Sequence, residues 1–362
     1  MTRLDAVEPE VLFTRDGQLG QITLNRPGSI NALTHGMVNA IQAMLDEWAD
    51  DPVIRTVLLT GSGERGLCAG GDILSLYRDA TSGDGTAAEA FFRDEYRLNA
   101  GIANYPKPFV AIMDGLVLGG GIGLSAHGSH RVVTERSSLG MPETGIGFVP
   151  DVGGTWLLSH APGELGTFLA LTAGFVRAED AIALGMADCF IGSDRIPALT
   201  AALATTDADR AIASLRQDPP SSALLAQQTW IDRAYIGDSV AAIIDRLRAS
   251  SDDAAQGAAQ SMSAKSPTAL AVTLASLRRA GRLPSLEAAL EQEYRVSIRA
   301  QRSPDFAEGV RAQIIDKDRQ PRWIPATLNE VDPAHVDSYF APLDPSDAQF
   351  TLSGRVPGTS AR

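Results

Sequence analysis

The sequence predicts an α/β fold with a helical region near the C-terminus. In roughly the first half of the chain, short runs of β-branched and apolar residues alternate with segments of helical periodicity. Several of these runs lead into glycine-rich loops, which is typical of strands that end at a turn or a binding loop. After about residue 195 the strand signals fade and long helical patterns take over.

These patterns divide the chain into three parts. We expect an α/β core with the active site over residues 1–195 and a helical C-terminal region over residues 196–345. The last twenty residues are rich in Pro, Ser, Gly and Thr, so we expect a flexible tail over residues 346–362.

Local signals predict the individual elements of the core. Asp16-Gly17 separates two alternating runs and predicts a hairpin over 11–25. Thr34 is a suitable N-cap for a helix over 34–49, whose apolar residues fall on one face. The other expected elements are strands over 54–59, 109–113, 131–134 and 138–140 and helices over 86–104, 153–160, 164–172 and 178–184.

Composition excludes several classes of protein. The net charge of −13 argues against a broad nucleic-acid surface, because phosphate binding needs a basic field. Two cysteines, Cys68 and Cys189, are too few for an extracellular disulfide framework. No run approaches the ~20 apolar residues of a membrane span. The acidic N-terminus lacks the apolar core of a signal peptide, so we expect a cytoplasmic enzyme.

Two carboxylates, Glu143 and Asp151, lie in a segment otherwise made of apolar residues, glycines and prolines, over residues 141–154. Each alone has an ordinary explanation: Glu143 as a charge near a helix start, and Asp151 as the N-cap of a helix from Val152. Together in a poorly solvated segment they favour a general-base site, because buried carboxylates are costly. We expect their pKa values to split, with one raised and one low.

Two glycine clusters, over residues 61–72 and 119–123, are further candidates for a binding site. A dinucleotide fingerprint beginning at Gly121, with Glu135 as the ribose acid, is excluded. About seven residues separate Gly121 from the turn before Arg131, and a parallel crossover needs a dozen or more. The cluster then predicts either tight packing of a short helix or an oxyanion hole of backbone N–H groups.

These motifs resemble a known family. The segment MPETGIGFVPDVGG, residues 141–154, resembles the active-site segment of the 3-hydroxyisobutyryl-CoA hydrolases, a branch of the enoyl-CoA hydratase/isomerase (crotonase) superfamily. The segment over 91–98 and the C-terminal motifs Ser266-Pro-Thr268, Glu293-Tyr-Arg295 and Asp305-Phe-Ala-Glu-Gly309 are similar too. The resemblance covers about residues 11–342. It implies a crotonase-like spiral of repeated strand-strand-helix units with a helical C-terminal region, although the sequence displays no repeat.

The resemblance implies a role for five residues. Glu143 and Asp151 would be the catalytic acids, and the amides of Gly71 and Gly120 would form the oxyanion hole. Glu95 would bind the acyl hydroxyl, so that the substrate meets Glu95, Gly120, Glu143 and Asp151. A solvated helix position is the ordinary alternative for Glu95.

The resemblance also implies contacts with coenzyme A, through Arg26, Ala69, Asp72 and Ile73. Coenzyme A would be part of the substrate, and no other cofactor is expected. The histidines lack metal-ligand spacing, no GxSxG nucleophile elbow is present, and Cys68 fits a packed thiol better than a nucleophile. We expect no membrane or nucleic-acid partner, and a homo-oligomer would be in keeping with the superfamily.

The implied reaction is hydrolysis of a coenzyme A thioester, 3-hydroxyisobutyryl-CoA, in valine breakdown. Hydratases of the superfamily carry a second catalytic glutamate three residues beyond the middle glycine of the triplet, and here that position is Gly123. Water addition by two glutamates is therefore disfavoured. The alternatives are an enoyl-CoA hydratase or isomerase and a non-catalytic acyl-CoA binding protein.

Overall fold

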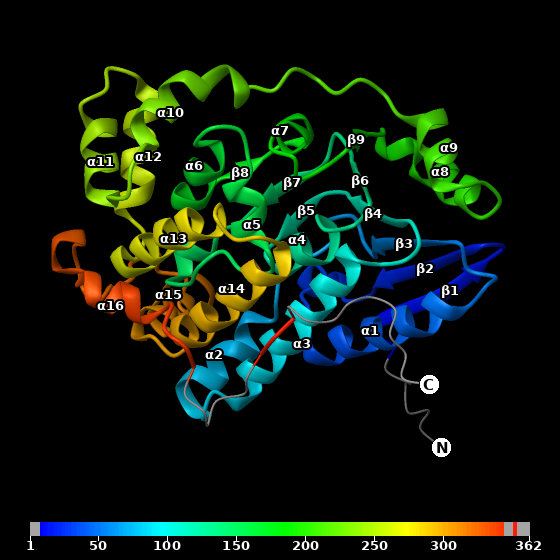
Figure 1. Cartoon of the computed structure of the whole chain (residues 1–362), viewed down its shortest axis with the longest axis horizontal. Coiled ribbons are helices and arrows are strands. Elements are labelled where there is room, and N and C mark those ends of the chain that lie inside the picture. Colours follow the sequence, from blue (N-terminus) through cyan, green and yellow to red (C-terminus); the bar gives the residue numbers. More distant parts are fainter. Residues whose placement is uncertain (1–7, 344–349, 353–362) are drawn as a thin grey trace.

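Two sheets of mainly parallel strands form the N-terminal half of the chain (Figure 1). The computed structural model describes residues 8–343 and 350–352. The larger sheet has the order β1-β2-β3-β4-β6-β9, with only the β1–β2 hairpin antiparallel. Its strands are β1 (Val11–Asp16), β2 (Leu19–Leu24), β3 (Thr56–Gly61), β4 (Phe109–Met113), β6 (His130–Val133) and β9 (Cys189–Phe190). The smaller sheet consists of β5 (Leu116–Leu118), β7 (Ser138–Gly140) and β8 (Phe175–Val176).

The strands are laid down in turns of a spiral. Successive turns add β2, β3, β4 and β6 to the larger sheet, each parallel to the one before. Each turn also adds a short segment beside it: Leu33 bridges Gly71, Cys68 bridges Val117 of β5, and β5 pairs with β7. The expected repeat of strand, strand and helix is therefore present in space, although the sequence does not display it.

Helices follow the second segment of each turn. Thr34 caps α1 by accepting a hydrogen bond from the amide of Met37, as the sequence predicts. The helix predicted from Val152 instead begins at Gly154, with Gly153 as its N-cap, so the interpretation of Asp151 as a helix cap is wrong. The core helices are α1 (His35–Asp50), α2 (Ile73–Ser82), α3 (Thr86–Ala103), α4 (Gly120–Ser125), α5 (Gly154–Ser159), α6 (Leu165–Thr172) and α7 (Ala178–Ala183).

Both faces of the larger sheet are covered, which explains why its central strands, β3 and β4, are mainly apolar. Leu58, Val110 and Ile112 pack against residues of α8 and α9, whereas Leu59 and Ala111 belong to the core shared with α1 and α3. In Figure 1, α8 and α9 lie at one end of the molecule and α10 to α12 at the other, joined by a long segment across the top.

The chain after residue 195 is helical, in agreement with the sequence. Its helices are α8 (Ile196–Leu203), α9 (Ala208–Leu215), α10 (Gln228–Tyr235), α11 (Val240–Arg248), α12 (Asp253–Ser263), α13 (Pro267–Ala280), α14 (Leu286–Gln301), α15 (Pro304–Val310) and α16 (Pro333–Ser338). Shorter segments are η1 (Pro27–Ser29), η2 (Glu143–Ile146), η3 (Ser193–Arg195), η4 (Leu225–Gln227), η5 (Arg311–Ile315) and η6 (Leu328–Glu330). Because α13, α14 and α15 pack directly on α5, α3 and η2, this region completes the core; the division at residue 195 stays a prediction.

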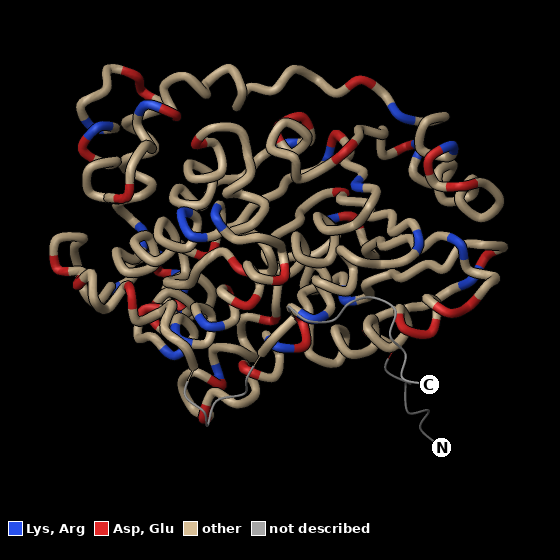
Figure 2. Tube along the Cα trace, viewed as in Figure 1, with Lys and Arg blue, Asp and Glu red and all other residues tan. Residues whose placement is uncertain are grey.

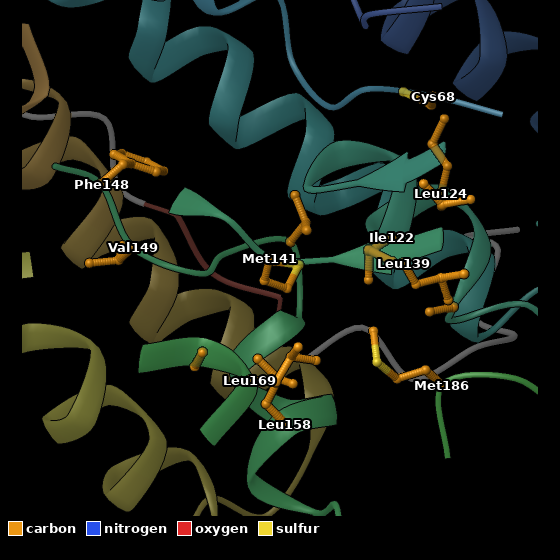
Figure 3. Close-up of a cluster of buried hydrophobic side chains, with 14 of the residues drawn as sticks. Cys68, Ile122, Leu124, Leu139, Met141, Phe148, Val149, Leu158, Leu169 and Met186 are labelled. Carbon is orange, nitrogen blue, oxygen red and sulfur yellow. The ribbon is translucent and has the colours of Figure 1, made fainter. Parts of the chain in front are cut away.

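A continuous hydrophobic core supports the segment that carries the two predicted acids. Figure 3 shows Met141 between the side chains of β7 and those of α5 and α6, with Phe148 and Val149 farther along the same segment. Phe148 stacks on Phe92 of α3 and contacts Phe306 of α15. The segment is thus held from the core and from the C-terminal helices at once.

Charged residues are spread over the whole fold. Lys and Arg residues are interspersed with Asp and Glu along the trace (Figure 2). Among the described residues, no helix combines the length and the apolar character that a membrane crossing requires. The tail predicted over 346–362 lies outside the described residues except for 350–352.

Gly309 of α15 allows this helix to lie against η2, the turn that begins at Glu143. A Cβ atom at position 309 would be 2.3 Å from the backbone carbon of Ile146. We expect Gly309→Ala to lower the free energy of unfolding by about 1–3 kcal/mol, because the backbone must move to admit the methyl group.

Gly257→Ala is the matched control, since Gly257 is also helical and has no atom within 4 Å of the added Cβ. It should be neutral or stabilising by up to about 1 kcal/mol. Chemical unfolding of both variants checks the prediction, and equal stabilities would contradict it.

Candidate active site

Three predicted site residues occupy equivalent places in successive turns of the spiral. Gly71 ends the segment that bridges Leu33 and β5, shortly before α2 begins at Ile73. Gly120 opens α4 after β5, and Glu143 opens η2 after β7. Because neighbouring turns are in register, the starts of their helices lie side by side. The fold therefore brings together residues that are up to 72 positions apart, from Gly71 to Glu143.

A cavity of about 400 Å³ lies where these turns meet. Its lining includes all three predicted acids, Glu95, Glu143 and Asp151. It also includes four other residues predicted for the site: Gly71, Gly120, Ala69 and Ile73. The remaining wall is mainly apolar, with aromatic and aliphatic side chains from α2, α3 and the C-terminal region. A largely apolar cavity with a few convergent polar groups is typical of a small-molecule site.

The amides of Gly71 and Gly120 are adjacent, and both are available to donate a hydrogen bond to a ligand. A Cβ atom at position 120 would be 3.4 Å from the backbone nitrogen of Gly71. Among the described residues, no hydrogen bond engages the Gly71 amide, whereas its neighbours take part in the pairs Leu33 N–Gly70 O and Asp72 N–Leu33 O. Gly120 is the first residue of α4, where an amide has no partner within its own helix. The two amides can therefore serve one ligand oxygen.

Glu143 and Glu95 reach the same stretch of backbone from opposite elements. A Cβ atom at Gly119 would be 2.9 Å from Oε1 of Glu143, and one at Gly120 would be 2.6 Å from Oε1 of Glu95. Oε2 of Glu143 and Oε1 of Glu95 are both buried and have no hydrogen-bond partner among the described residues. Unpartnered buried acceptors are costly, so a ligand that supplies donors would find both positions ready.

Asp151 is held by a tyrosine from the facing helix. The hydroxyl of Tyr96, on α3, donates a hydrogen bond of 2.7 Å to Oδ2 of Asp151. The next residue, Val152, has a φ of 53°, a left-handed conformation that a β-branched residue rarely adopts. Such strain persists where the surroundings impose it and is frequent at functional sites.

Burial raises the pKa values of all three acids. For Glu143 and Glu95 burial is the main cause, and in both the charge of Asp151 raises the pKa further, well above the ordinary range. Burial raises the pKa of Asp151 to about 7, although the hydrogen bond from Tyr96 opposes the shift. The predicted split into one raised and one low pKa is therefore wrong, because burial acts on both acids.

A glutamate of the C-terminal region fixes the loop that follows Asp151. Glu293, buried on α14, accepts hydrogen bonds from the amides of Gly153 and Thr155 at 2.6 and 2.9 Å and from the Thr155 hydroxyl at 2.5 Å. Burial raises its pKa to about 8. It takes the place of a side-chain cap at the start of α5, since the N-cap residue there is Gly153.

The position at which hydratases carry their second glutamate is filled by neighbouring side chains. A Cβ atom at Gly123 would be 2.7 Å from Cβ of Val152 and 2.8 Å from Nδ2 of Asn99. No side chain larger than hydrogen fits there without displacing both. The Val152 that closes this position directly follows Asp151.

Two of the predicted coenzyme A contacts do not line the cavity. Arg26 donates to the carbonyl of Ala32 at 2.5 Å and pairs with Asp72 at 3.2 Å and with Glu10 at 3.1 Å. Asp72 also caps α2 through the amide of Ser75. Both residues are adjacent to the loop over 68–73 but face protein partners.

The sequence interpretation missed three residues at or next to the cavity: Tyr96, Glu293 and Lys265. Tyr96 and Glu293 belong to motifs that the sequence already singles out. The helical period also places Glu293 beside Leu290 and Tyr294 on a buried face, a signal that could have found it. Lys265 lines the cavity, and burial lowers its pKa.

The interpretation of Cys68 as a packed thiol agrees with the structure. Cys68 is buried, and burial raises the pKa of its thiol to about 12, so it is a packed thiol and not a nucleophile. Within residues 8–343 and 350–352, no cluster of three His, Cys, Asp or Glu side chains could hold a metal ion.

Comparison with known proteins agrees with this geometry. The enoyl-CoA hydratase/isomerase family matches residues 19–340. Relatives named "3-hydroxyisobutyryl-CoA hydrolase, mitochondrial" include the protein of Xenopus tropicalis, 39% identical over 97% of this chain and 93% of the relative. The human relative is 38% identical over 96% and 92%. Their names place them in mitochondria and so do not support the expected cytoplasmic location.

Solved structures have the same fold but other names. A structure named carnitinyl-CoA dehydratase from Mycobacterium thermoresistibile is 51% identical, with a TM-score of 0.92 and coverage of 96% of this chain and 100% of its own. An enoyl-CoA hydratase from Rhodobacter sphaeroides is 43% identical, with a TM-score of 0.88 and coverage of 92% and 98%. These matches confirm the resemblance and the crotonase-like fold. The chain belongs to the enoyl-CoA hydratase/isomerase family.

Proposed function

We propose that this protein hydrolyses a coenzyme A thioester, and that its substrate is 3-hydroxyisobutyryl-CoA. The observation that carries the proposal is the convergence of Glu143 and Asp151 on a cavity that the free amides of Gly71 and Gly120 also reach. A thioester carbonyl needs both: donors for the charge that develops on its oxygen, and a base that delivers water to its carbon.

In the proposed reaction, the amides of Gly71 and Gly120 bind the thioester oxygen. One such donor is typically worth about 10²–10³ in rate. Glu143 either removes a proton from the attacking water or attacks the carbonyl itself to give an anhydride. Asp151 orients the water or the leaving group, and its negative charge raises the pKa of Glu143. The proton that Glu143 takes from water passes to the leaving thiolate. A base with a raised pKa takes a proton more readily at neutral pH.

Glu95 suits a substrate with a hydroxyl on its acyl group. Its Oε1 atom is buried, lacks a partner among the described residues, and lies beside Gly120. A substrate hydroxyl would supply the missing hydrogen bond, whereas an unsubstituted acyl chain would leave the acid unpaired. This chemistry fits the name shared by the curated relatives, and with it a place in valine breakdown.

The coenzyme A moiety of the substrate would extend from the thioester along Ala69 and Ile73. Among the described residues that line the cavity, Lys265 is the cation, so it is suited to an anionic group of coenzyme A. Arg26 and Asp72 would take part at the adjacent loop, provided that they exchange their present ion pair for ligand contacts. A homo-oligomer and a cytoplasmic location stay predictions.

Hydration or dehydration of an acyl-CoA double bond is the second candidate. It is favoured by the names of the two solved structures and by Glu95, which could act as a second acid beside Glu143. It is opposed by Gly123, where Val152 and Asn99 leave no space for the glutamate of the hydratases. Two assays separate the activities. A hydrolase releases free thiol from 3-hydroxyisobutyryl-CoA, whereas a hydratase removes the enoyl absorbance of crotonyl-CoA.

Glu143→Gln tests the catalytic assignment. The change keeps the shape of the side chain and removes the base, so we expect thiol release to fall by at least about 10³-fold while coenzyme A still binds. Thiol release and calorimetric binding of coenzyme A measure the two effects. Glu64→Gln, on an exposed loop, is the matched control and should hydrolyse at the wild-type rate. A near-normal rate in Glu143→Gln would remove Glu143 from the mechanism.

Glu95→Ala tests the choice of acyl group. We expect the wild type to favour 3-hydroxyisobutyryl-CoA over isobutyryl-CoA by about 10²-fold or more in kcat/KM, because the hydroxyl satisfies the buried acid. The variant should lose most of this preference and keep its rate on isobutyryl-CoA. The ratio of kcat/KM for the two thioesters measures it, and an unchanged ratio would assign Glu95 to structure alone.

Glu143→Gln also tests the electrostatics of the site through stability. The pKa of Glu143 is raised above its ordinary value of 4.5 in the folded protein, so the folded state binds more protons than the unfolded state above that pH. The wild type is then fully stabilised below about pH 4.5 and loses stability as the pH rises through the folded pKa. Chemical unfolding at pH values from 5 to 8 measures this effect. Relative to the wild type, the free energy of unfolding of the variant should increase by at least about 1 kcal/mol between pH 5 and pH 8. A difference that does not change with pH would refute the raised pKa.

A further inference from the structure

Tyr96 lies at the contact between the core and the C-terminal region. Its side chain is fully buried on α3, where its ring packs against Phe92 and Tyr294 with centroids 6.0 and 6.3 Å apart. Its hydroxyl contacts two polar groups, Oδ2 of Asp151 at 2.7 Å and Oγ of Ser297 on α14 at 2.8 Å. It does not line the cavity, so it acts on the reaction only through a neighbour.

The direction of these two hydrogen bonds follows from the proton count. An ionised carboxylate only accepts, so the one hydrogen of the Tyr96 hydroxyl points to Asp151. The Ser297 hydroxyl then donates to the Tyr96 oxygen. This gives a directed chain from Ser297 through Tyr96 to Asp151, which crosses from the C-terminal helices into the active site.

The two oxygens of Asp151 are thereby distinguished. Oδ2 accepts from Tyr96, whereas no side chain among the described residues donates to Oδ1, and the side chain of Asp151 borders the cavity. A carboxylate without the tyrosine could rotate and exchange its oxygens. With one oxygen held, the other keeps a fixed direction toward a water molecule or a thioester.

We propose that Tyr96 is a positioning residue for Asp151, whose Oδ2 it holds so that Oδ1 faces the substrate, and that Ser297 orients the Tyr96 hydroxyl. The proposal rests on the proposed function for the role of Asp151 in turnover. It gives the C-terminal region a part in the chemistry, because Ser297 belongs to α14.

Asp151 sits among further acids, so its ionisation needs support. Glu95 of α3, Glu143 of η2 and Glu293 of α14 all interact with it electrostatically. His127 contacts the neighbouring Val152 carbonyl at 2.8 Å, and burial lowers its pKa to about 4, so it supplies no charge at neutral pH. The hydrogen bond from Tyr96 is the side-chain interaction that favours the ionised form of Asp151.

Tyr96→Phe removes this hydrogen bond and leaves the ring packing intact. We expect the pKa of Asp151 to rise by about one pH unit, because a hydrogen bond to the charged form is lost. Carbon-13 NMR of aspartate-labelled protein follows the titration directly, with Asp151→Asn supplying the assignment. An unchanged Asp151 titration would overturn the proposal, whichever thioester the enzyme cleaves.

Kinetic measurements provide a second test of the proposal. Tyr96→Phe should lower kcat for thiol release by about 10-fold or more and change KM little. In the Asp151→Asn background the same change should cost nothing further, because Tyr96 acts through Asp151. Additive losses in the double variant would overturn the proposal and reduce Tyr96 to packing.

Two controls separate positioning from stability. Tyr235→Phe removes the hydroxyl of another fully buried tyrosine, which contacts the sulfur of Met262 at 3.4 Å, and should leave kcat and the Asp151 titration unchanged. Ser297→Ala should give a smaller shift in the same direction as Tyr96→Phe. If the wild type released no thiol, the proposed function would fail, while the NMR titration would still decide the role of Tyr96.

Discussion

The constraint on which this structure depends is the burial of negative charge. Glu95, Glu143 and Asp151 share one cavity, Glu293 lies behind it, and burial raises the pKa of each. Within the part of the chain that the structure describes, no ion pair offsets this cost, whereas hydrogen bonds from Tyr96 and from the loop at Gly153 and Thr155 do so in part. Among the described residues, Oε1 of Glu95 and Oε2 of Glu143 are buried without a hydrogen-bond partner, and both side chains line the cavity, so the unfavourable part of the burial is concentrated where a substrate could relieve it.

The spiral explains why such a site can form from separate parts of the chain. Each turn ends its second segment at the same level, so Gly71, Gly120 and Glu143 meet although the sequence separates them widely. The C-terminal helices then close the assembly. Gly309 lets α15 approach the turn of Glu143, and Glu293 of α14 holds the loop beyond Asp151. The helical region therefore contributes to the wall of the candidate site, through Lys265, Gln313 and Ile314.

Sequence reasoning succeeded where the signal is local. The turn at Asp16-Gly17 and the cap at Thr34 are set by adjacent residues, and both agree with the structure. Sequence reasoning did not predict the strand β5, because it is only three residues long. It also did not predict the helix α2, because this helix follows directly on a glycine-rich loop. The pKa of Asp151 could not be predicted, because it depends on burial by elements that fold against it from over a hundred residues away.

The loop that carries Asp151 and Val152 bears on the choice between hydrolysis and hydration. Val152 occupies the space beside Gly123 in which a second glutamate would have to lie, and its left-handed backbone is fixed by Glu293 through the next amide. Asp151 is carried on this loop, with its side chain turned to Tyr96 and the cavity. A side chain at position 123 would thus compete with Val152 and Asn99 for one volume, and Val152 directly follows Asp151 on this loop. A change from one chemistry to the other would require the loop and α14 to be rebuilt together, which a single substitution at Gly123 cannot achieve.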